Sequence, residues 1–320
     1  MKKMLNSEHI EGRVYSHNLA LKKVQNKESE NFGKDFIGGS LDIATDDECL
    51  NIVTVQFTYV TPTTSKGNAN ATFNALKNII EKNSTILQVG KEAAMMVKVD
   101  TALGLNDFYS SKNGEETLVS AKRNEGGFVT IVDRIASNES DRNKFDMDML
   151  INGARYVESD PEKNIEEHLV IKGAVFNFRN AILPVEFVVK NPVGIKYFEN
   201  LELSQSNMLF TRVWGFINST VVKNTKIKES AFGDAVVETF EKNVKEWVMT
   251  GSAPEPYEIG DEKNGITLEE LKKAIEDREI YLAKTKAKQD EYLASKAAAA
   301  NTFGNIGNAG VSAVQGGFNF

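Results

Sequence analysis

The stretch Leu50-Asn-Ile-Val-Thr-Val-Gln-Phe-Thr-Tyr-Val60 decides the fold class of this chain. It is dense in β-branched and aromatic residues, which favour a half-buried pleated strand, and it follows the acidic turn Asp46-Asp-Glu48. After a loop at residues 62–70, residues 71–82 place apolar side chains at helical spacing. With further strands on both sides, this order predicts a five-stranded Greek-key barrel that has a helix between its middle strands.

Predicted strands continue on both sides of this strand and helix. Before them lie residues 10–15 and 35–44, and apolar residues alternate in the second stretch. After them come four stretches of strand composition, at residues 94–99, 103–109, 118–123 and 128–132. Asn113-Gly114, between the second and third of these, indicates a tight hairpin turn.

A second segment, residues 168–259, has a similar order of elements. Strands are predicted at residues 169–178, 182–189, 209–217, 219–222 and 246–250, and helices at residues 193–203 and 235–245. Ile10-x-Gly12-x-Val14-Tyr15 and Ile171-x-Gly173-x-Val175-Phe176 share one pattern, and glycine inside a strand often marks a bulge or bend. The pattern favours two related barrels in tandem, although so few fixed positions also fit a chance match.

The predicted fold class is therefore mainly β (α+β), with tandem OB-like five-stranded barrels followed by a C-terminal helix and a flexible tail. The predicted limits are 8–135 for the first barrel, 136–165 for a bridging segment, 166–260 for the second barrel, 266–300 for the helix and 301–320 for the tail. The tail is rich in Gly, Asn and Ala and ends in Phe318-Asn-Phe320.

The composition is that of a cytoplasmic globular protein. The chain has 320 residues, of which 41% are hydrophobic, and this is enough for one or two cores. Its single cysteine, Cys49, forms no internal disulfide, which fits a reducing compartment. The sequence starts without an apolar segment of secretory length and contains no stretch that would span a membrane.

No pattern of catalytic or metal-binding residues is found. Phosphate-binding and dinucleotide-binding glycine loops are absent, and His9, His17 and His168 do not have metal-ligand spacing. Cys49 has no nearby base, so a small buried side chain is expected there. Asp46-Asp-Glu48 is interpreted as a hairpin turn and not as a carboxylate metal site. We therefore expect no enzyme activity, no cofactor and no metal.

Aromatic and cationic residues on predicted strands are the candidates for a nucleic-acid site, because single-strand binders combine stacking rings with basic grooves. The candidates are Phe108, Tyr109, Lys122, Arg123, Phe128, Phe178, Arg179, Arg212 and Trp214. Aromatic residues that alternate on strands are more often core, so this alternative stays open for each ring. The net charge of −7 counts against a coat of nucleic acid, although a local basic groove can coexist with it.

The chain resembles a family of single-stranded DNA-binding proteins from the replication modules of tailed phages of Gram-positive bacteria. The resemblance rests on Asp42-Ile-Ala-Thr-Asp46, Asn106-Asp-Phe-Tyr109, Lys122-Arg-Asn-Glu-Gly-Gly-Phe128 and Phe210-Thr-Arg-Val-Trp-Gly215. It implies tandem barrels and single-stranded DNA binding without sequence preference, in phage replication or recombination in the host cytoplasm. The alternative is a structural or assembly protein of the phage particle that has no nucleic-acid ligand.

The expected partners follow from the same resemblance. Single-stranded DNA is the expected ligand, and replication or recombination proteins are expected to contact the C-terminal helix or tail. The tip Phe318-Asn-Phe320 lacks the acidic residues found in the similar tail of bacterial single-strand binders, which puts docking by the tip in doubt. A homo-oligomer stays open, and no membrane partner is expected.

Overall fold

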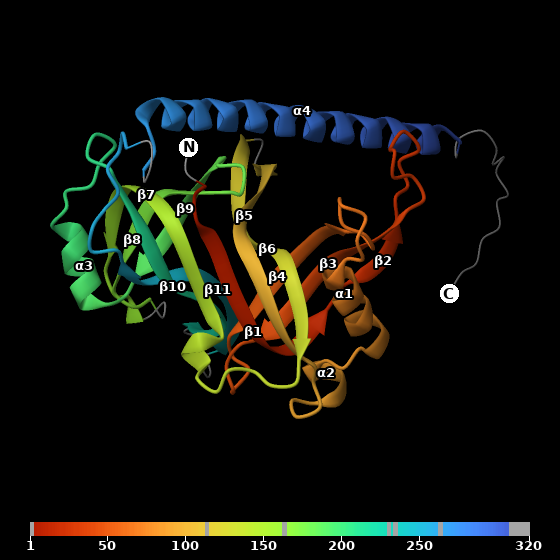
Figure 1. Ribbon diagram of the computed structural model, residues 1–320, viewed down its shortest axis with the longest axis horizontal. Helices are drawn as coiled ribbons and strands as arrows, with labels where there is room; N and C mark the ends of the chain where they lie inside the picture. Colours follow the sequence, from red (N-terminus) through yellow and green to blue (C-terminus); the bar gives the residue numbers. More distant parts are fainter. Residues whose placement is uncertain are drawn as a thin grey trace. The chain divides into compact units, whose positions relative to one another are not determined.

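The computed structural model describes residues 3–112, 115–161, 165–228, 232, 236–261 and 265–306 (Figure 1). The chain forms two compact units. The first contains the residues up to 105 together with residues 122–274, and the second contains residues 106–121 and the chain from residue 275 onward. The predicted turn Asn113-Gly114 and the chain tip Phe318-Asn-Phe320 lie outside the described residues.

Five strands, two of which continue into the second unit, close the first barrel. They are β1 (Asn6–His17), β3 (Asp35–Ala44), β4 (Ile52–Val60), β5 (Met96–Lys112) and β6 (Glu115–Val132). Strand β1 pairs with β3, β3 with β4, β4 with β6, β6 with β5, and β5 with β1. The β4–β6 pairing is parallel, at Val55–Asn124 and Gln56–Glu125. This closed order is the topology of an OB barrel.

The second barrel repeats this order. Its strands are β7 (Asn143–Val157), β8 (His168–Phe176), β9 (Ile182–Val189), β10 (Leu209–Lys228) and β11 (Val236–Ser252). Strand β7 pairs with β8, β8 with β9, β9 with β11, β11 with β10, and β10 with β7. The β9–β11 pairing is again parallel. The prediction of a mainly β chain with tandem OB-like barrels is confirmed.

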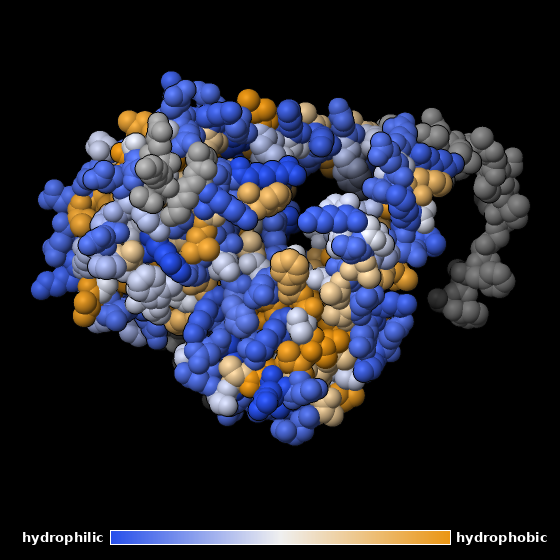
Figure 2. Space-filling model, viewed as in Figure 1, coloured by the Kyte–Doolittle hydropathy of each residue, from blue (hydrophilic) through white to orange (hydrophobic). Residues whose placement is uncertain are grey.

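A capped helix lies between the third and fourth strands of each barrel. Helix α1 (Ala71–Lys82) follows β4, and the Asn70 side chain accepts a hydrogen bond from the Thr72 backbone at 3.1 Å. Helix α3 (Pro192–Glu199) follows β9, and Asn191 caps it in the same way. The short helix α2 (Ile86–Val89) buries none of its residues. Apolar residues gather on the surface in the region of α1 and α2 (Figure 2).

Two glycines allow the first two strands of each barrel to cross closely. A Cβ atom on Gly12 of β1 would lie 2.0 Å from the carbonyl oxygen of Ala44, and one on Gly173 of β8 would lie 2.2 Å from that of Leu150. A side chain at either position would therefore collide with the neighbouring strand. The two glycine motifs nevertheless occupy different positions, since β1 is the first strand of its barrel and β8 the second, so they are not equivalent copies.

The first strands of the two barrels join them into one eleven-stranded sheet. Residues 6–10 of β1 pair antiparallel with residues 143–147 of β7, and the short strand β2 (Ala20–Lys23) extends β3 at the other end of the strand order. The main apolar core contains buried residues of both barrels. Strand β7 lies in the segment that was predicted to bridge the barrels, and it pairs with strands of both. The predicted domain limits stay a prediction.

One local prediction needs correction. A helix was predicted at residues 235–245, but residues 236–245 belong to β11, where pairing with β10 from Lys228–Val236 to Val213–Ser252 overrides their helix-forming composition. The predicted C-terminal helix is present as α4 (Leu268–Ile306). Among the described residues, no helix is long and apolar enough to cross a membrane.

The second unit is held by a buried ion pair. Arg278 of α4 donates two hydrogen bonds to the carboxylate of Asp107 on β5, at 2.6 and 2.8 Å, and the Ser120 hydroxyl donates a third at 2.6 Å. The Gln289 amide pairs with both backbone groups of Tyr109. The α4 side chains thus satisfy polar groups of the β5–β6 hairpin.

Candidate nucleic-acid interface

An open groove of about 650 Å³ lies on the outer face of the first barrel, where β2, β3 and β4 are neighbours. We call it the β2 groove. It is lined by Lys22, Lys23, Val24, Gln25, Asn26, Phe36 and Tyr59. In OB barrels, this second- and third-strand face and its adjoining loops bind oligonucleotides. The groove therefore lies where the fold presents a ligand surface.

A row of three side chains crosses the β2 groove. Lys22 of β2 is the cross-strand partner of Phe36 on β3, and the Phe36 ring packs against that of Tyr59 on β4 with centroids 4.8 Å apart. Tyr59 is 44% exposed and Phe36 is half-buried. The row thus offers aromatic surface beside a cation, the combination that single-strand binders use.

The charge of the groove comes from β2. Lys23 lies 3.2 Å from Asp35 in an exposed ion pair, so its charge is partly balanced. Lys22 is exposed, and no carboxylate in the described part of the chain pairs with it. Sequence reasoning missed this site because Phe36 and Tyr59 read as ordinary strand aromatics. Their proximity to Lys22 depends on strand pairing.

Lys122, predicted to contact phosphate, lies at the junction of the two barrels. Its ammonium donates a hydrogen bond to the Glu186 carbonyl and lies 4.7 Å from the Trp247 ring centroid and 5.8 Å from that of Phe187. Burial lowers the pKa of Lys122 to about 8. The Lys122 ammonium is therefore already engaged by the Glu186 carbonyl and the two rings.

Its sequence neighbours differ from it in exposure. Arg123 donates two hydrogen bonds to Glu125, at 2.8 and 3.0 Å, so its charge is balanced. Phe128 is 77% exposed on β6 and is free to stack. Lys122 and Arg123 are therefore both engaged by other groups of the chain. Of these three predicted residues, Phe128 alone has no such contact among the described residues.

Phe108 and Tyr109 belong to the second unit. Phe108 is exposed, while Tyr109 carries the Lys286 ammonium 5.2 Å from its ring centroid. The Lys286 ammonium also pairs with Glu116. Tyr109 thus already has a cation over its ring.

Phe178 and Arg212 line one cleft of about 500 Å³. We call it the Phe178 cleft. Phe178 is strongly exposed in the turn after β8, and the Arg179 guanidinium lies 5.0 Å from its ring centroid. Arg212 is bound to Asp146 through two hydrogen bonds. Arg179 is therefore the more available cation for a phosphate.

Trp214 lies in another pocket, of about 670 Å³, which we call the Trp214 pocket. Its lining is Thr45, Asp46, Asn51, Glu139, Ser140, Asn143, Lys144, Phe145, Asp146, Trp214, Gly215, Phe216 and Thr250. Trp214 and Phe216 share one face of β10, and both are about two-fifths exposed. The nine predicted residues thus fall into several separate groups.

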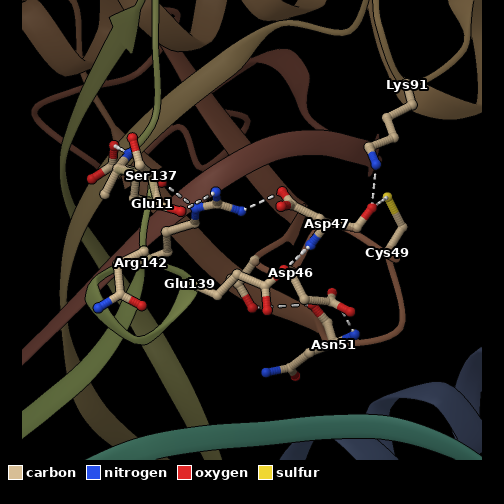
Figure 3. A network of polar contacts seen from close by, with 12 residues as sticks. Glu11, Asp46, Asp47, Cys49, Asn51, Lys91, Ser137, Glu139 and Arg142 are labelled. Carbon is tan, nitrogen blue, oxygen red and sulfur yellow. Dashed lines mark hydrogen bonds and ion pairs between the residues drawn. The ribbon is translucent and has the colours of Figure 1, made fainter.

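A polar network around Arg142 joins the turn between β3 and β4 to the segment that connects the barrels (Figure 3). The Arg142 guanidinium is buried and donates to Asp47 at 2.7 Å and to the Ser137 carbonyl at 3.3 Å. Asp47 in turn donates its backbone N–H to Glu139 at 2.6 Å. The Arg142 contact holds the pKa of Asp47 below its usual range. The acidic turn predicted from the sequence is therefore present and anchored.

Glu8 is a buried carboxyl at the same junction. It accepts hydrogen bonds from the Thr101 hydroxyl at 2.6 Å and from the Trp247 indole N–H of the second barrel at 2.8 Å. Burial raises the pKa of Glu8 to about 7, although both hydrogen bonds oppose the rise. Within the described residues, no group of three or more His, Cys, Asp or Glu side chains is placed to hold a metal ion.

Comparison with known proteins found similar solved structures and one matching family model. Two crystal structures of the single-stranded DNA-binding protein from Thermus aquaticus, a deletion mutant and the wild type, are similar to this chain at 9% identity and a TM-score of 0.44. The match covers 82% of this chain in both cases, and 100% and 98% of the Thermus chains. No curated protein sequence matches. The family model described as YorF matches residues 5–288, and the chain therefore belongs to the YorF family.

Proposed function

We propose that this protein binds single-stranded DNA without base-sequence preference, with the β2 groove as its main contact surface. The observation that carries the proposal is the row of Lys22, Phe36 and Tyr59, which runs from β2 across β3 and β4 of an OB barrel. Stacking on aromatic rings is tolerant of sequence because every base has a π-face. The protein is proposed to act as a binder without catalysis.

The Phe178 cleft is the proposed second contact on the DNA path. Phe178 offers an exposed ring, and Arg179 holds a cation beside it. Phe128 supplies a further exposed ring on β6. Lys122, Arg123 and Arg212 are not proposed as phosphate contacts, because each is engaged by groups of this chain.

The process that DNA binding serves is a separate part of the proposal. Replication or recombination of phage DNA rests on the sequence resemblance alone, and so does the idea that proteins of these processes dock on α4 or the tail. The competing function is a component of a phage particle. Such a protein would form large assemblies and would ignore oligonucleotides.

The test measures binding of a fluorescent oligo(dT) as a function of salt concentration. The wild-type affinity should fall steeply with salt, since each neutralised phosphate releases about one counterion. Replacing both Lys22 and Lys23 by Ala should weaken binding and reduce the log–log salt slope by about one to two. The matched control is the adjacent exposed pair Lys272 and Lys273 on α4, whose replacement by Ala should change neither quantity.

Two results would overturn the proposal. Absence of oligonucleotide binding by the folded wild type, together with rings or tubes in electron micrographs, favours the particle component. Equal losses from the β2 and α4 lysine pairs would show non-specific attraction instead of a site in the β2 groove. Oligo(dA) and oligo(dC) should bind like oligo(dT) within a few-fold, and a strong preference would contradict the sequence-independent mode.

A further inference from the structure

The Trp214 pocket has aromatic walls that are held in place by the barrel. A Cβ atom on Gly251 would lie 2.5–2.8 Å from atoms of the Trp214 indole, so one side of the ring packs directly on the β11 backbone. Phe216 is two residues further along the same face of β10, and the buried Phe145 of β7 also lines the pocket. The walls thus present fixed ring surface to whatever enters the pocket.

The rim of the Trp214 pocket is negative. Asp46 accepts hydrogen bonds from the backbone N–H groups of Leu50 and Asn51, at 3.0 and 2.8 Å, and Glu139 accepts one from Asp47 (Figure 3). These donors are neutral, and within the described residues no cation pairs with Asp46 or Glu139. Both carboxylates therefore keep their charge for an incoming group.

The cations nearby are already balanced. Lys144, which lines the pocket, pairs with Asp141 at 2.5 Å. Arg212, two residues before Trp214, is bound to Asp146, which also lines the pocket. After these pairs are subtracted, the rim retains the charges of Asp46 and Glu139. This field disfavours a phosphate and favours a cation.

We propose that the Trp214 pocket binds a basic peptide segment of a partner protein, with a Lys or Arg side chain over the Trp214 ring and its charge facing Asp46 and Glu139. An aromatic face attracts such a cation, and the apolar stem of the same side chain packs against Phe216. This goes beyond DNA binding. The β2 groove lies on the first barrel, whereas the aromatic residues that line the pocket come from β7 and β10 of the second barrel.

The chain offers a direct spectroscopic readout. It has two tryptophans, of which Trp214 is 40% exposed and Trp247 is fully buried. The probe is a short peptide in which Lys and Phe alternate, titrated into the full-length protein while tryptophan fluorescence is followed. We expect saturable binding that changes the Trp214 emission and protects it from acrylamide. A peptide with Glu in place of Lys should not bind.

Two kinds of variant separate the walls from the charge. Asp46→Asn with Glu139→Gln keeps the hydrogen-bond acceptors and removes both charges, so it should weaken the Lys–Phe peptide roughly tenfold. Trp214→Ala should remove most of the affinity, measured with a fluorescein label on the peptide. The matched control is Tyr156→Ala, since Tyr156 is 44% exposed on β7 and does not line the pocket. Thermal melting of each variant identifies any loss of folding.

Oligo(dT) supplies the opposing outcome. A saturating oligonucleotide should leave peptide affinity and Trp214 emission unchanged, and Trp214→Ala should bind oligo(dT) as the wild type does. Quenching of Trp214 by oligo(dT), or competition between oligo(dT) and the peptide, would overturn the proposal and assign the pocket to the DNA path. Equal peptide binding by the charge variant and the wild type would also overturn it. Failure of DNA binding alone would leave the peptide result intact.

Discussion

The β2 groove and the Trp214 pocket both present aromatic side chains on barrel strands, yet their charges are opposite. In the groove, Lys22 stands beside Phe36 and Tyr59 without a carboxylate partner in the described part of the chain. In the pocket, Asp46 and Glu139 line the same space as Trp214, and no cation of the described residues pairs with either carboxylate. The comparison teaches that an exposed ring alone does not identify a DNA site. The charged side chains beside the ring, which come from distant parts of the sequence, decide which kind of ligand the surface favours.

The largest expected effect concerns the junction on which both surfaces depend. Trp247→Ala should lower the free energy of unfolding by about 3–5 kcal/mol, because it leaves a cavity and removes the hydrogen bond to Glu8. Trp214→Ala should lower it by about 1 kcal/mol, since that ring is partly exposed. Urea unfolding measures both. Similar losses of stability for the two variants would show that Trp214 is a core residue. The Trp214 pocket could then no longer be compared with the β2 groove as a ligand surface.

A second effect is a dependence of stability on pH. The folded pKa of Glu8 is about 7 against 4.5 without burial, so the folded state holds a proton that the unfolded state releases between these values. Wild-type stability should therefore fall as pH rises through this window, by up to about 3 kcal/mol from Glu8. Glu8→Gln keeps a neutral hydrogen-bonding group.

The pH prediction is checked by urea unfolding of wild type and Glu8→Gln at several pH values. The two proteins should have similar stability near pH 4.5, and the variant should be the more stable one above pH 7. Because the two proteins share all other titrating groups, their difference isolates Glu8. A difference that does not change with pH would contradict the raised pKa.

A third effect separates the groove from the pocket in DNA binding. Tyr59→Ala should weaken oligo(dT) binding by about 1–3 kcal/mol with little change in salt slope, because a stacking ring is lost and no charge changes. Fluorescence anisotropy at several salt concentrations measures both quantities. Trp214→Ala, the matched change in the pocket, should leave the affinity unchanged. The reverse result would exchange the roles of the two surfaces.

The smallest effect tests the Phe178 cleft as an extension of the DNA path. Arg179→Ala should weaken oligo(dT) by about 0.5–1 kcal/mol and flatten the salt slope slightly, because it removes one exposed cation. Arg212→Ala should change affinity less, since its charge is already paired with Asp146. An equal or larger loss for Arg212→Ala would show that DNA displaces Asp146 from this pair.

Local sequence predicted the fold well where the pattern within an element decided it. The helix at 71–82 was predicted with the observed bounds, and the strand at 50–60 appears as β4, with Val53, Val55 and Phe57 facing the core. Residues 236–245 were predicted wrongly as part of a helix, because their Glu and Lys content favours a helix in isolation. Their pairing with β10 depends on the hairpin and could not be read locally.

The candidate site was harder to predict than the fold. Lys122 looked like an exposed cation, but its partner carbonyl on Glu186 is 64 residues away in the sequence, so its burial follows from barrel packing. Phe36 and Tyr59 were not among the candidates, because strand alternation does not tell which face carries a ligand. Arg142 was not singled out from the sequence, although its guanidinium donates a hydrogen bond to Asp47 and holds the acidic turn in place. In each case the deciding neighbour comes from another strand.

The pairing of β1 with β7 has a consequence for how this chain can be shortened or recombined. Each of these strands hydrogen-bonds to the other barrel as well as to its own. Cutting the chain between residues 132 and 143 would leave unpaired backbone N–H and C=O groups along β1 in one fragment and along β7 in the other. Such open edges are templates for intermolecular strand addition and aggregation. We therefore expect either barrel, expressed without the other, to aggregate, and neither to serve as a module that can be exchanged alone.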